Sequence, residues 1–161
     1  MAGGGDFTLV DTGLLTAAGT LTAANIALNS GTIAVTGSVG AVTLLTLIAG
    51  AGGIALNSGN ILSGATVDLS ATGGGVSQVA GGKIAATVLR SGPGVTGTVN
   101  LAGTLNNVGT LRKFVVVSGD FSLVDNGNAG LLTIAGPVTA ANVSVANATT
   151  GSIAVDRKSV V

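Results

Sequence analysis

The stretch GDFTLVD at residues 5–11 returns almost unchanged as GDFSLVD at residues 119–125, and this repetition governs the choice of fold. The first Asp of each stretch, Asp6 and Asp120, are 120 − 6 = 114 residues apart. A fixed internal period is typical of repeat architectures, in which each unit buries its apolar side against the next. The chain is therefore expected to be a repeat protein.

The similarity extends beyond the heptad. After a three-residue insertion, residues 14–16 (LLT) align with residues 131–133, and GTIAV at 31–35 aligns with GSIAV at 151–155. Repetition over this length indicates one structural unit that is copied along the chain. The predicted organisation is a single β-solenoid segment over residues 1–161, with one long repeat of about 114 residues (5–118) and part of a second copy (119–155).

Within the copies, apolar residues alternate with polar or small ones, as in Phe7 and Leu9, Ile26 and Leu28, or Val99 and Leu101. This period of two predicts short strands, and the Gly- and Asn-containing stretches between them predict turns. Glu is absent and Lys, Arg and Gln are scarce, so almost no helix is expected. The short echo IALNSG, at 26–31 and 54–59, has the spacing of solenoid coils of uneven length.

The predicted fold is all-β, a parallel β-helix (β-solenoid) with irregular coils, about six to eight in number. Aromatic residues make up only 2% of the chain, so Val, Leu, Ile and Ala must fill a narrow core. Each coil is expected to place like residues above like, with apolar stacks inside and polar ladders beside them. The candidate ladder or turn residues are Asn25, Asn57, Asn100 and Asn142.

Composition argues against several functional classes. Charged residues are 7% of the chain, the net charge is zero, and the six Lys and Arg residues are scattered, which disfavours nucleic acid as a partner. His and Cys are absent, which removes the usual zinc ligands. No catalytic, cofactor-binding or metal-ligating residue is predicted, and no cofactor.

Two features of the sequence could form a dinucleotide-binding or catalytic site. GPGVTG at residues 92–97 fits the dinucleotide pattern G-x-G-x-x-G, but Pro93 lies inside it and no amphipathic helix follows, so a coil turn is predicted. Six Asp residues are the only acids, and their close pairs, Asp6 with Asp11 and Asp120 with Asp125, recur with the repeat. Recurrence favours turn and capping roles over a unique active site.

Two alternatives remain open beside a structural role. Parallel β-helices also carry polysaccharide-cleaving enzymes, which use acidic residues. A membrane-embedded protein is the other alternative, because mean hydropathy is +0.74 and residues 39–56 have the minimum length of a membrane-spanning helix. Against that helix, the segment contains four Gly residues and has no flanking Lys, Arg, Trp or Tyr.

The stretches LNNVGTL (105–111), GDFSLVD (119–125) and LTIAGPVTAANVSV (132–145) together resemble the repeat regions of filamentous-haemagglutinin-like exoproteins and related large autotransporter-type adhesins. The resemblance implies a right-handed parallel β-helix that is secreted or exposed at the cell surface. It also implies an adhesive or matrix-forming rod. The expected function is a structural or adhesive rod segment that is not an enzyme. Its expected partners are copies of itself, by coil stacking or fibre assembly, and a host-cell or matrix surface.

Overall fold

The computed structural model describes residues 4–57, 59–127, 130–147 and 150–156, and these form strands and turns with no helix. Every pairing between those strands is parallel. The strands are β1 (Asp6–Val10), β2 (Leu14–Ala17), β3 (Thr20–Val35), β4 (Ser38–Leu56), β5 (Ile61–Ala71), β6 (Val76–Gln78), β7 (Lys83–Arg90), β8 (Val99–Leu101), β9 (Asn107–Leu111), β10 (Phe114–Val115), β11 (Phe121–Asp125), β12 (Leu131–Ile134), β13 (Val138–Thr139), β14 (Val143–Asn147) and β15 (Ser152–Val155).

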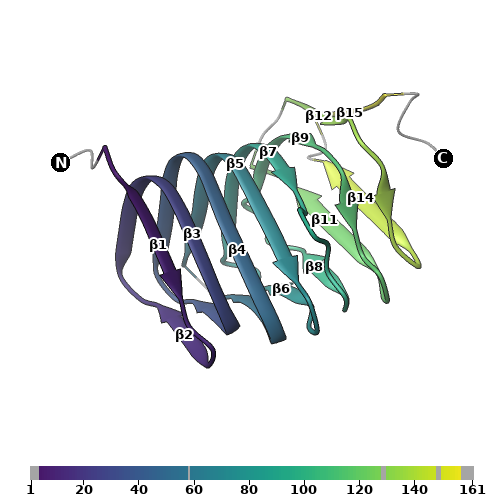
Figure 1. The fold of residues 1–161 in the computed structure, drawn as a ribbon. Helices are drawn as coiled ribbons and strands as arrows, with labels where there is room; N and C mark the ends of the chain where they lie inside the picture. Colours follow the sequence, from purple (N-terminus) through teal and green to yellow (C-terminus); the bar gives the residue numbers. More distant parts are fainter. Residues whose placement is uncertain (1–3, 58, 128–129, 148–149, 157–161) are drawn as a thin grey trace.

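The strands wind into a β-solenoid of about 7 turns, which confirms the predicted fold and coil number. Figure 1 shows the coils stacked side by side, with the two ends of the chain at opposite ends of the stack. Each coil has three faces. The long strand β3 passes through all of them, and its register with β4 shifts at two corners, between Ala23 and Asn25 and between Ser30 and Thr32.

The coils differ in length, as the irregular echoes in the sequence predicted. Phe7 pairs with Ile26 and Ile26 with Leu45, so each of the first two coils contains 19 residues (26 − 7 = 19 and 45 − 26 = 19). Leu45 pairs with Val67 and Val67 with Leu89, so each of the next two coils takes 22 residues (67 − 45 = 22 and 89 − 67 = 22). Some of the additional residues lie at the corners inside the long strands, because the register of β3 with β4 shifts at two corners and that of β4 with β5 shifts between Gly40 and Leu44.

The core is a set of apolar stacks that run along the axis. One stack follows a single face, each member pairing with the next in register. Its members are Leu15, Ile33, Ile54, Val76, Val99, Phe121 and Val143. The interior is narrow, and its fully buried aromatic rings, Phe114 and Phe121, lie in the later coils with their centroids 4.8 Å apart. Stacking like with like removes each apolar side chain from water on both sides, which is the main stabilising term of the fold.

Close coil stacking depends on glycine at one corner. Gly53 has a φ of 71°, which glycine adopts without steric cost, and a Cβ there would collide with the carbonyl oxygen of Gly75 in the next coil. A Cβ at Gly75 would in turn collide with the carbonyl oxygen of Thr98. Three successive coils thus approach one another through bare backbone at this corner.

The two long copies make the same local contacts on different faces. β1 pairs with residues 25–29 of β3, and its copy β11 pairs with β14 in the equivalent register. Strands that pair with one another from coil to coil along one face form a column. β11 lies in the column that begins with β2, and not in the column that begins with β1. The two copies of the long repeat therefore lie on different faces, because 114 residues do not make a whole number of coils.

Residues 39–56, the candidate membrane helix, lie in strand β4. No helix long and apolar enough to cross a membrane occurs in the part of the chain that the structure describes.

Candidate functional site: the two open ends of the solenoid

The first coil leaves the apolar core uncovered on one side. It consists of β1, β2 and residues 20–23 of β3, and each of these pairs with a following coil only. The side chains that point into the core at this end form the N-terminal end surface, which we define as Phe7, Leu9, Leu15, Ala17 and Leu21. These residues line a cavity of about 260 Å³.

Exposure of large apolar groups is marked at this end. Phe7 is 37% exposed, although a buried Phe is the usual case, and Val10 and Leu14 are more exposed still. Within the described residues, no strand pairs with these strands on their outer side, so backbone N–H and C=O groups are left there without a neighbouring strand. An uncovered apolar edge of parallel strands is a template for pairing with another chain.

The last described coil is open in the same way. β14 and β15 pair only with preceding strands, β11 and β12. We define the C-terminal end surface as Val143, Val145, Ile153 and Val155. Val143 is 49% exposed and Val155 is 50% exposed. The two ends therefore expose apolar surfaces of similar character at opposite poles of one stack (Figure 1).

Asn25 and Asn142, two of the four predicted ladder residues, make side-chain hydrogen bonds between coils. The amide Nδ2 of Asn25 donates to a carboxylate oxygen of Asp6 at 2.7 Å, and Asn142 donates to Asp120 at 2.7 Å. These are matched Asp–Asn pairs on the outside of the solenoid, one in each copy, in place of a ladder of Asn on Asn. Asn57 lies in the turn after β4 and Asn100 is exposed in β8.

The buried polar contacts involve residues that the sequence did not single out. The amides of Gln78 and Asn106 bond reciprocally at 2.8 and 3.0 Å, and Asn106 also accepts the N–H of Ile84 at 2.8 Å. Asn106 donates further to the carbonyl oxygens of Leu101 and Val124. Both side chains are buried, so this network joins successive coils through one corner and satisfies groups that water cannot reach.

Asp11 and its copy Asp125 take different roles. Asp11 accepts the N–H of Thr12 at 2.7 Å, which confirms the turn role predicted for it. Its copy, Asp125, is instead fully buried and accepts the N–H of Val108 in the preceding coil at 3.0 Å. Burial raises the pKa of Asp125, and the bond from Val108 partly opposes that rise. The turn role predicted for Asp125 is wrong, because a coil covers β11 on both sides while β1 has a coil on one side only.

A charged groove of about 690 Å³ runs across the later coils. In it Asp68 accepts Nε–H of Arg90 at 2.8 Å and the backbone N–H of Gly92 at 2.7 Å, and Arg112 and Lys113 lie on the next coil. Gly92 therefore belongs to the loop between β7 and β8, as the turn interpretation of residues 92–97 predicted. The spacing of Asp68 and Arg90, 90 − 68 = 22 residues, is one coil, which is the signal that would have revealed the pair.

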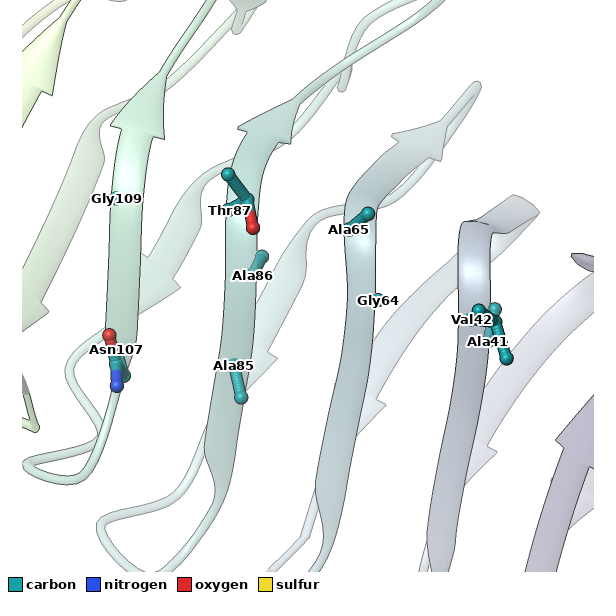
Figure 2. Close-up of a pocket in the computed structure, with 9 residues that line it drawn as sticks. All are labelled: Ala41, Val42, Gly64, Ala65, Ala85, Ala86, Thr87, Asn107 and Gly109. Atoms are coloured by element: carbon teal, nitrogen blue, oxygen red, sulfur yellow. The ribbon is translucent and has the colours of Figure 1, made fainter. Parts of the chain in front are cut away.

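A shallower groove of about 590 Å³ crosses four coils and is shown in Figure 2. It is lined mostly by small side chains, with Thr87 and Asn107 as its polar members. Among the described residues, no group of three or more acidic, His or Cys side chains is placed to hold a metal ion.

No protein-family model matches the chain, and neither a curated protein nor a solved structure matches it.

Proposed function

We propose that this chain is a structural and adhesive rod segment of an exported surface protein or extracellular fibre, and that its first partner is a copy of itself. One observation carries the proposal. The described coils form a single parallel stack whose apolar core is open at both ends, at Phe7 on one side and at Val143 and Val155 on the other. Solenoids usually protect their ends with capping repeats that have a polar outer face.

The side faces support a contact role over a chemical one. Outward positions on one face are small and neutral along its whole length. They are Thr16, Ala34, Ala55, Ser77, Asn100, Ser122 and Ser144. This row of side chains carries no charge, which suits lateral packing or adhesion to a host-cell or matrix surface. The absence of Cys from the chain also fits an exported fibre that folds without disulfides.

The acidic side chains support the same conclusion. Asp68 is engaged by Arg90, Asp6 by Asn25 and Asp120 by Asn142, while Asp125 is buried within the stack. Glycoside hydrolysis requires two carboxyl groups that flank one bond of a bound sugar. The bonds that these Asp residues make are structural, which favours a rod over a polysaccharide-cleaving enzyme.

Electron microscopy of the purified chain tests the proposal. We expect elongated particles or filaments whose axis carries the strand spacing of about 4.7–4.9 Å in diffraction. Long filaments would identify a self-assembling subunit, and short separate rods would identify a segment of a larger adhesin. Particles without an elongated axis, or release of sugars from polysaccharides incubated with the protein, would contradict the structural role.

A further inference from the structure

We propose that the N-terminal end surface of one molecule stacks on the C-terminal end surface of a second copy, turned by one face of the solenoid about the common axis. This inference rests on the proposed structural function and adds to it the partner, the strand register and the rotation between successive molecules.

A contact of the proposed kind already exists inside the chain. β11 and β12 are sequence copies of β1 and β2, and their N-terminal side is covered by β8 and β9. Phe121 pairs there with Val99, and Leu123 with Leu101. The uncovered edge of the first coil thus has nearly the same sequence as an edge that another coil of this chain already covers.

The C-terminal end surface repeats the apolar pattern of an earlier coil. β14 lies in the same column as β8, so Val143 and Val145 occupy the positions of Val99 and Leu101 on opposite sides of β11. β15 bears the same relation to β9. Val155 takes the position of Leu111, since both pair with Ile134. The C-terminal end therefore presents to an incoming coil the apolar pattern that β8 and β9 present to β11 and β12.

These two observations define the contact between the molecules. β1 of the incoming molecule adds to β14 with Phe7 on Val143, Thr8 on Ser144 and Leu9 on Val145, and β2 adds to β15. Phe7, 37% exposed, and Val143, 49% exposed, become buried against each other. Main-chain bonds of the added strands contribute affinity, as in other cases of strand addition to an open edge. The surfaces are different on the two molecules, so the contact is head-to-tail and repeats into a filament.

The rotation follows from the columns. β1 is the first strand of one column, and β14 is the last described strand of the neighbouring column. When β1 is placed on β14, each molecule is therefore rotated about the axis by one face, a third of a turn of the solenoid, relative to the molecule before it. The same turn relates β1 to its copy β11 within the chain.

Disulfide trapping distinguishes the three possible rotations, because the chain contains no Cys of its own. Thr8, Thr16 and Thr22 are exposed on the three faces of the first coil, and each would lie opposite Ser144 in one rotation only. Three double variants are therefore compared, each with Ser144→Cys and with Thr8→Cys, Thr16→Cys or Thr22→Cys. Neighbouring parallel strands are about 4.8 Å apart, within the range that a disulfide spans.

We expect the variant with Thr8→Cys to form disulfide-linked dimers and higher multimers on mild oxidation, while the other two remain monomeric on a non-reducing gel. Ser122→Cys with Ser144→Cys, neighbours within one molecule, is the control for reactivity in this geometry. Multimers from the Thr16 or Thr22 variant instead, or links between two copies of position 144, would overturn the inference. Filaments by microscopy with no link in any variant would overturn it while leaving the proposed fibre role intact. No filament and no link would remove both self-association and this contact.

Discussion

Truncating Phe121 and Phe7 in parallel tests whether the two copies of the heptad have the different environments described above. Phe121 is fully buried and its ring lies 4.8 Å from that of Phe114. Phe121→Ala therefore removes a whole core side chain, which costs about 3–5 kcal/mol of the free energy of unfolding. Phe7 is 37% exposed in the monomer, and full burial of a Phe is worth only about 1.5–3 kcal/mol, so Phe7→Ala should cost roughly 1–2 kcal/mol.

Urea denaturation followed by far-ultraviolet circular dichroism measures both values, at a protein concentration where gel filtration shows a monomer. The chain has no Trp or Tyr, so the β-sheet signal is the appropriate probe. Losses of equal size for the two variants would refute the assignment of β1 to an open end and β11 to the interior. At concentrations that give assembly, Phe7→Ala should in addition lose the disulfide-linked multimers of the Thr8 variant.

Two further predictions concern buried polar groups. Burial raises the pKa of Asp125, so the fold holds that proton more tightly than the unfolded chain, and stability should fall as pH rises from the ordinary carboxyl range through the raised value. Asp125→Asn should abolish this dependence and increase stability at pH 7, as pH-dependent urea titrations of the variant and of the parent chain will show. Asn106→Ala leaves two buried donors without an acceptor, at about 1–3 kcal/mol each, and should lower the unfolding free energy by roughly 3 kcal/mol. A loss below about 0.5 kcal/mol, the level expected of the exposed control Asn100→Ala, would contradict the network.

Much of the fold was predictable because it depends on local pattern. Alternation of apolar residues indicated strands such as β11 and β8, and scarcity of helix-forming residues indicated that helices would be few. The turn at residues 92–97 followed from Pro93 and its glycines. The buried contacts were not predictable in this way, because Gln78 and Asn106 are 28 residues apart and meet only when the coils have their actual, unequal lengths.

The amino-acid sequence by itself determined that this chain is a repetitive all-β solenoid of about six to eight coils with a narrow aliphatic core, since period-two patterning and self-similarity can be read along the chain. Only the tertiary structure decided which copy of a nearly identical motif is inside. Phe7 and Phe121, or Asp11 and Asp125, occupy matching positions of the two heptads, yet one of each pair is exposed and the other buried. The reason is physical: burial in a solenoid requires a coil on both sides of a strand, and the number of coils that cover a strand is set by its place in the stack.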